Sequence, residues 1–309
     1  MYTLYKTGQS VAYCPKCALN SRTYIIITNA VLRLTLKTAD LTCDIVRNIN
    51  IKRMVLTLEF TKELKKLCSS VRKTVEKYNM IEDGDRIAVG VSGGKDSLTL
   101  LAVMSALKGF YPKSFELCAI YVDTGFEEAG YCTLEESAMI REYLNELCAS
   151  EGITLHIVST HIAQIVFSEK EEKNPCSLCA KMRRGALQNT AKNLGFNKLC
   201  LGHHMDDATE TFMMNLLNEG RIGAFPPVVH FDRSDITLIR PMVEVSEKDI
   251  TYFINKSSLK TIKNPCPMDK TSERESTKAL LKELSKEHRD IKKKILGAME
   301  RAGIDGYRP

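Results

Sequence analysis

The chain has 309 residues, 27% of them charged, and its formal net charge at pH 7 is +6. This composition is ordinary for a soluble globular protein, and the mild positive charge leaves open both plain solubility and a polyanionic partner. No apolar run is long enough to cross a bilayer and no signal-peptide layout is present, so we expect a cytoplasmic protein without a membrane partner.

Residues 1–55 form the first of two predicted domains, an amino-terminal segment whose pattern predicts no definite structure. Cys14 and Cys17 have the C-x-x-C spacing of half a zinc site. The next cysteines along the chain, Cys43 and Cys68, stand alone and supply no partner pair for this half site. The pair is therefore either a structural metal site or an incomplete one. Eleven cysteines in a cytosolic chain favour metal or redox chemistry over disulfides.

Residues 56–309 form the second predicted domain, which opens with a helix from about residue 60 to residue 78. Apolar residues make one face of this helix, and six lysines and arginines make the other face. The basic face is typical of solvated helix surface, and direct nucleic-acid contact is the alternative.

The next feature is the run Ser92–Ser97, whose sequence is SGGKDS. A strand is predicted directly before it, over residues 86–91, and a helix directly after it. Gly93 and Gly94 let the backbone approach a ligand closely, and the N–H groups that open the helix form an anion site. The loop is therefore predicted to bind a phosphate chain.

Lys95 adds a positive charge to this anion site, and the serine hydroxyl groups add donors. The run is not a Walker A loop, because Lys95 is followed by Asp96. It resembles the PP-loop of the N-type ATP pyrophosphatases, which cleave ATP to AMP and pyrophosphate.

Strands and helices then alternate, which predicts an α/β fold: a doubly wound parallel sheet with helices on both faces. The strands are expected over about residues 116–122, 153–158 and 198–201, and the helices over about residues 133–149, 177–194 and 207–217. Ligands bind beyond the carboxyl ends of parallel strands. The PP-loop, Asp123 and Gly202–His204 are therefore expected to share one crevice.

After Gly220 the pattern predicts a loop over residues 222–235 and a short strand over 237–239. A helical carboxy-terminal extension follows, with helices over about residues 246–255, 273–285 and 289–301. The last two helices are basic, and solvated surface or contact with a phosphate backbone would both explain this. Their basic residues are Lys282, Lys286, Arg289, Lys292, Lys293, Lys294 and Arg301.

Cys176 and Cys179 form a second C-x-x-C pair, at the start of a helix that carries Lys181, Arg183 and Arg184. Thiols near a helix N-terminus and cationic side chains are expected to have lowered pKa values, which makes them good metal ligands or nucleophiles. Cys266 is the one distant cysteine in the last part of the chain. The three thiols predict an iron–sulfur cluster, a zinc site or a redox dithiol, and spacing alone does not choose among them.

Four motifs in a fixed order resemble those of the tRNA 2-thiocytidine synthetases, the cluster-dependent sulfurtransferases that act on cytidine 32 of tRNA. The resemblance extends from about residue 59 to about residue 295. The motifs are SGGKDS at residues 92–97, PCSLCAKMRRGAL at 175–187, LGHHMDDATET at 201–211, and a later Pro-Cys at 265–266.

The resemblance implies a fold of the PP-loop ATP pyrophosphatase type, with ATP, Mg²⁺ and a [4Fe–4S] cluster as cofactors. It implies that Cys176, Cys179 and Cys266 hold the cluster. It implies nucleotide binding by Ser92, Gly93, Gly94, Lys95, Asp96, Ser97 and Gly202, with the Asp206–Asp207 pair lining the site. The implied catalytic residues are Lys95, Asp96, Asp207, Cys176 and Cys179.

The activity implied is adenylation of a base carbonyl of tRNA, followed by replacement of its oxygen by sulfur. The implied partners are tRNA and a sulfur donor such as a cysteine desulfurase, and a homodimer is left open. The chain departs from related proteins in one respect, because no second cysteine follows Cys266 closely. Two alternatives remain: uridine thiolation by the same chemistry, and a zinc- and nucleotide-binding regulatory protein without catalysis.

Overall fold

The computed structural model describes residues 4–6, 9–11, 61–169, 175–262, 265–268 and 273–309. The chain divides into two compact units, residues 1–55 and residues 56–309. In the first unit, β1 (Leu4–Lys6) pairs antiparallel with β2 (Gln9–Val11). Cys14 and Cys17 lie outside the described residues.

The second unit is built on a six-stranded sheet with the order β5-β4-β3-β6-β8-β7. All neighbouring strands are parallel except β7, which runs antiparallel to β8 at one edge. The predicted doubly wound α/β fold is confirmed. The strands are β3 (Asp85–Val91), β4 (Phe115–Asp123), β5 (Thr154–Ser159), β6 (Lys198–Cys200), β7 (Val228–Phe231) and β8 (Ile236–Ile239).

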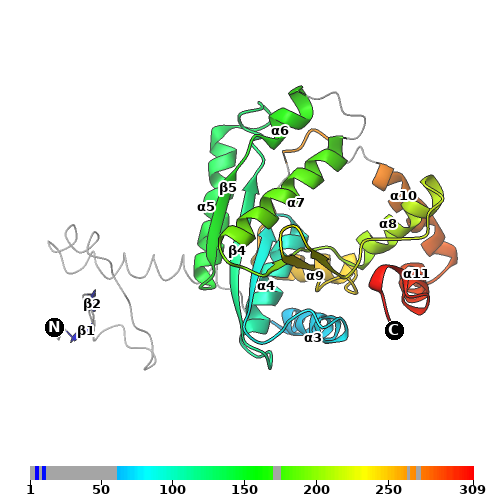
Figure 1. Cartoon of the computed structure of the whole chain (residues 1–309), viewed down its shortest axis with the longest axis horizontal. Coiled ribbons are helices and arrows are strands. Elements are labelled where there is room, and N and C mark those ends of the chain that lie inside the picture. The colour runs from blue at the N-terminus through cyan, green and yellow to red at the C-terminus, as the bar shows by residue number, and fades with distance from the viewer. Residues whose placement is uncertain (1–3, 7–8, 12–60, 170–174, 263–264, 269–272) are drawn as a thin grey trace. The chain divides into compact units, whose positions relative to one another are not determined.

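The central strand β3 is buried on both faces, as a parallel sheet covered by helices requires. Ile87 and Val89 point into one hydrophobic cluster, and Ala88 between them points into another. The first cluster is shared with the helices α3 (Lys62–Lys77), α4 (Lys95–Lys108), α5 (Leu134–Ser150) and α9 (Glu247–Lys256). The second is shared with α6 (Ile162–Gln164), the π-helical turn Ile165–Glu169 and α7 (Pro175–Asn193), which crosses the other face of the sheet (Figure 1).

The helical carboxy-terminal extension is present as expected. The helices α10 (Glu273–Glu287) and α11 (Ile291–Arg301) pack against α8 (Met205–Asn218), and a short 3-10 turn, Ile304–Gly306, follows (Figure 1). Among the described residues, no helix combines the length and apolarity needed to cross a membrane.

Helix ends follow from short-range chemistry. Thr133 and Glu136 form the capping box that their spacing predicts, and Thr61 caps α3 by accepting from the Leu64 N–H at 3.2 Å. Gly195 has a φ of +74°, the left-handed conformation that glycine adopts without strain, where α7 ends.

One expectation for the fold is wrong. Residues 222–235 do not form only a loop, because Val228–Phe231 pairs with β8 as strand β7. The four-residue strand directly follows two prolines, so its own pattern is too short to predict it. The helical turns of residues 162–169 had no element predicted for them, and packing of Ile162 and Val166 under the sheet stabilises them.

Candidate active site

The PP-loop is the turn that joins β3 to α4. The Ser97 hydroxyl group donates to the Gly94 carbonyl at 3.0 Å and accepts from the Ser92 N–H at 3.1 Å, which closes the loop on itself. Gly94 is the N-cap of α4 and makes no side-chain cap bond. The first N–H groups of α4 therefore keep the unsatisfied donors of a helix start, and these attract an anion.

At Gly93 and Gly202 the neighbouring atoms lie so close to the backbone that a side chain would clash with them. Gly93 has a φ of +77°, and a Cβ atom at this position would meet Ile262 at 2.7 Å. A Cβ atom on Gly202, which follows β6, would lie 3.1 Å from the Asp96 carbonyl oxygen and 3.3 Å from the Ser97 nitrogen. The loop after β6 is therefore packed directly against the backbone of the PP-loop.

Lys95 lies at the start of α4 between two carboxylates. Its Nζ is 2.8 Å from Asp96 Oδ1 and 3.2 Å from Glu247 Oε1. Burial disfavours the ammonium charge, but the hydrogen bonds and charges of Asp96 and Glu247 outweigh it and raise the pKa of Lys95. Lys95 is therefore a stable cation beside the anion site.

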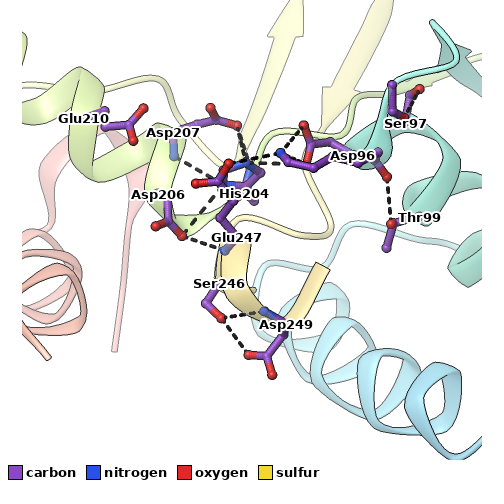
Figure 2. Close-up of polar contacts among 12 residues, drawn as sticks. Asp96, Ser97, Thr99, His204, Asp206, Asp207, Glu210, Ser246, Glu247 and Asp249 are labelled. Carbon is purple, nitrogen blue, oxygen red and sulfur yellow. Dashed lines mark hydrogen bonds and ion pairs between the residues drawn. The ribbon is translucent and has the colours of Figure 1, made fainter. Parts of the chain in front are cut away.

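His204 and Asp207 of the run GHHMDD (residues 202–207) lie at the start of α8, on the side of the PP-loop. The buried His204 is the N-cap of α8, and its Nε2 lies 3.6 Å from Asp96 Oδ1 and 3.5 Å from Asp207 Oδ2 (Figure 2). The Asp207 carboxylate accepts from the His204 N–H at 3.0 Å. Asp207 therefore caps the helix, and His204 connects it to Asp96 of the PP-loop.

Asp206 points away from Asp207 and ties three elements together. Its Oδ1 is 2.6 Å from the Nζ of Lys292 on α11, and its Oδ2 accepts from the Glu247 N–H at 2.7 Å. Figure 2 shows Asp206 turned toward Glu247. Asp206 thus anchors the start of α9, and Lys292 is bound to this anchor rather than forming part of a solvated basic surface.

His203 is held as a neutral ring. Burial, together with the positive charge of Arg240, lowers the pKa of His203 to about 4. The Arg240 Nε–H donates to His203 Nδ1 at 3.3 Å, and the ring packs on Phe225 with centroids 4.9 Å apart. His203 is therefore a structural residue in this state.

Asp123, at the end of β4, forms its ion pair with Arg141 of α5 at 2.7 Å. It also accepts from the Gly125 N–H at 3.1 Å. The contacts of Asp123 thus fix the loop after β4, whereas the GHHMDD run contacts the PP-loop directly.

The three candidate ligand cysteines come from two segments. Cys176 is exposed on the first turn of α7, and Cys179 and Cys266 are half-buried. Burial raises the pKa of the Cys179 thiol, Arg183 opposes the rise, and Cys266 and Cys176 add to it. The lowered thiol pKa expected from the sequence is wrong for Cys179, because desolvation outweighs the nearby cation.

Cys176 and Cys266 each act electrostatically on Cys179, so each of these two thiols lies near Cys179. Within the ranges that the structure describes, no three His, Cys, Asp or Glu side chains are grouped closely enough to hold a single metal ion.

Comparison with known proteins decides the family. Residues 57–284 match a family model described as a PP-loop domain. The tRNA-cytidine(32) 2-sulfurtransferase of Geobacter sulfurreducens is 37% identical over 241 residues, which cover 76% of this chain and 89% of that protein. The chain belongs to the PP-loop tRNA-cytidine(32) 2-sulfurtransferase family.

A second tRNA-cytidine(32) 2-sulfurtransferase and one solved structure are also similar to this chain. The tRNA-cytidine(32) 2-sulfurtransferase of Geotalea daltonii is 40% identical over 238 residues, which cover 76% of this chain and 90% of that protein. Among solved structures, the U34-tRNA thiolase NcsA from Methanococcus maripaludis with its [4Fe–4S] cluster matches with a TM-score of 0.63 and 25% identity. The match covers 78% of this chain and 79% of that one.

The structure adds residues to this PP-loop site that the sequence did not indicate. Glu247 contacts Lys95, and it also contacts Lys278 of α10 at 3.1 Å. Arg274 of α10 lies 3.4 Å from Asp207 and 3.3 Å from Glu210. Each of these is a charged residue on a helix far along the chain, and no local pattern marks it as part of the site.

Proposed function

We propose that this protein is a tRNA-cytidine 2-sulfurtransferase, which uses ATP to replace the 2-oxygen of cytidine 32 in tRNA by sulfur. One observation carries the proposal. The same chain holds a PP-loop, with Lys95 at the start of its helix, and the Cys179 thiol with the thiols of Cys176 and Cys266 near it. The relatives of this chain are tRNA-cytidine(32) 2-sulfurtransferases.

The first step activates a poor leaving group. The carbonyl oxygen at C2 of cytosine attacks the α-phosphorus of ATP, a new O–P bond forms, and the bond from the α-phosphorus to the bridging oxygen breaks. Pyrophosphate leaves, and Lys95 and the N–H groups that open α4 stabilise the charge that gathers on it. Asp96 and Asp207 are the carboxylates that would hold Mg²⁺ with the nucleotide, and that ion supplies further neutralisation of phosphate charge.

The second step forms the product. A sulfur nucleophile attacks C2, the C–O bond breaks, and AMP leaves with the oxygen. We assign Cys176, which is exposed, and Cys179 to the sulfur-transfer end of the site.

Cys176, Cys179 and Cys266 have the donor chemistry of a [4Fe–4S] site, since such clusters are held by cysteine thiolates. Each thiolate of a cubane binds a different iron, so its ligands need not converge as closely as those of one ion. When bound to three thiolates, the cluster supplies an iron position open to sulfur. Support comes from the U34-tRNA thiolase, which contains such a cluster.

The substrate base must leave its stack to reach the ATP, and an unpaired tRNA loop makes this inexpensive in free energy. Exposed lysines of α3 and α11 are the proposed contacts to the tRNA backbone. They are Lys62, Lys65, Lys66, Lys73, Lys293 and Lys294.

Further parts of the proposal concern the setting of the reaction. A sulfur donor such as a cysteine desulfurase supplies the sulfur, and the reaction takes place in the cytoplasm. Residues 1–55 form an accessory amino-terminal domain and residues 56–309 the catalytic domain, which acts as a homodimer.

Nucleoside analysis of tRNA tests the proposed substrate. Bulk tRNA from a strain that lacks the gene is expected to lose 2-thiocytidine, and a plasmid copy is expected to restore it. Loss of a thiouridine instead would support uridine thiolation, which the likeness to the U34-tRNA thiolase favours. Unchanged thionucleosides, with no tRNA-dependent release of pyrophosphate by the purified protein, would support a regulatory protein without catalysis.

A further inference from the structure

Glu247 brings two lysines from different elements together at the PP-loop. The Nζ of Lys95 lies 3.2 Å from Glu247 Oε1. The Nζ of Lys278, on α10, lies 3.2 Å from the same oxygen and 3.1 Å from Oε2. Because both ammonium groups contact Oε1, Lys278 is an immediate neighbour of the PP-loop lysine.

The carboxylate between them is fixed in place. Glu247 is the first residue of α9, Ser246 caps that helix, and the Glu247 N–H donates to Asp206 at 2.7 Å. Burial would raise the pKa of Glu247, but the hydrogen bonds and charges of Lys278 and Lys95 outweigh it and lower this pKa to about 2. One anchored negative charge therefore holds two cations.

The Lys278 ammonium group can also donate hydrogen bonds to a ligand. Its side chain is 42% exposed, and an ammonium group carries three donors, of which Glu247 uses part. A polyphosphate bound at Lys95 carries several negative charges over neighbouring phosphates. A second cation next to Lys95 offers these further charges a partner.

We propose that Lys278 is a second phosphate-binding residue of the ATP site, which contacts the pyrophosphate part of ATP beside Lys95 and is positioned by Glu247. The inference rests on the proposed function, because it takes ATP as the ligand of the PP-loop. It also gives α10 a direct role in the nucleotide site. A purely structural Lys278 would instead only tie α10 to α9.

Binding of AMP and of pyrophosphate distinguishes a phosphate-binding Lys278 from a purely structural one. AMP lacks the phosphates that Lys278 is proposed to contact. Calorimetric titrations of ATP, inorganic pyrophosphate and AMP, each with Mg²⁺, would be made on the full chain. Lys278→Met is expected to weaken binding of ATP and pyrophosphate about tenfold, and of AMP less than about twofold. Lys278→Arg keeps the charge and is expected to retain most of the affinity.

The matched control is Lys282→Met, which removes an exposed lysine one turn later on α10 and is expected to leave all three affinities unchanged. Lys278→Gln serves as a second neutral variant, and thermal melting establishes that each variant is folded. Equal losses for all three ligands, or no loss in a folded neutral variant, would overturn the proposal. A wild-type protein that binds neither ATP nor pyrophosphate would overturn the proposed function together with this inference.

Discussion

At the scale of single residues, we propose that the Lys95 side chain is critical for chemistry and dispensable for folding. Its side chain is 31% exposed, and Lys95 is not among the buried residues of the core. Ion pairs of this kind contribute little to stability, whereas a cation aimed at a leaving pyrophosphate stabilises charge that develops in the transition state.

Lys95→Ala is therefore expected to reduce tRNA-dependent pyrophosphate release about a hundredfold or more, and to change the free energy of unfolding by less than about 1 kcal/mol. Lys108→Ala, at the exposed end of the same helix, is the control and should retain activity. Full pyrophosphate release by a folded Lys95→Ala protein would contradict the assignment of the PP-loop.

At the scale of elements, the PP-loop depends on the loop after β6. An alanine Cβ at position 202 would press on the Asp96 carbonyl at 3.1 Å, so the start of α4 must shift by a few tenths of an ångström. Gly202→Ala is expected to cost about 1 kcal/mol of stability and to weaken ATP binding several-fold, as measured by melting and calorimetry. The comparison variant is Gly185→Ala in α7, where nothing lies within 4 Å and helix propensity should add about 0.5–1 kcal/mol. Equal ATP affinities in the two variants would show that the contact at Gly202 does not shape the site.

The packing of α10 and α11 on α8 encloses Glu210, which is only 3% exposed. Burial raises the pKa of Glu210 to about 7, although Arg274 and Lys292 oppose this rise. The folded-state pKa exceeds the unfolded value of 4.5, so the protonated form is favoured in the native state. Stability is therefore greatest below the unfolded pKa and is lost as the pH rises through 7.

Between pH 6 and pH 8, this titration is expected to remove about 1 kcal/mol of the wild-type free energy of unfolding. Glu210→Gln mimics the neutral form and should flatten that dependence in denaturant melts at several pH values. Glu219→Gln, with a 59% exposed side chain, should keep the wild-type slope. Identical slopes in Glu210→Gln and the wild type would show that Glu210 does not titrate in this range.

At the scale of the whole molecule, the sequence predicted the parts of the site that lie in contiguous motifs. SGGKDS predicted a strand–loop–helix anion site because glycine, lysine and a helix start act over a few residues. Glu247 and Lys278 gave no such signal, because each is a charge on an amphipathic helix until the fold places it beside Lys95. Lys292 was even predicted as basic surface, and only the packing of α11 on α8 shows that it pairs with Asp206.

The whole chain also separates two proposed sites, because the proposed ATP site is the PP-loop and the thiols come from α7 and residues 265–268. Cys266→Ser should therefore lose bound iron while ATP affinity stays within about twofold of wild type, since a serine hydroxyl group remains protonated where a thiol ionises. The measurement is iron, acid-labile sulfide and ATP binding on protein purified without oxygen.

Cys132→Ser, at another half-buried cysteine, is the control and should keep its iron. Full iron content in Cys266→Ser would remove Cys266 from the ligand set, and zinc in place of iron in the wild type would refute the cluster itself. A joint loss of iron and ATP binding would show instead that the two sites are coupled, with the chain from Cys266 into α10 as the connecting element.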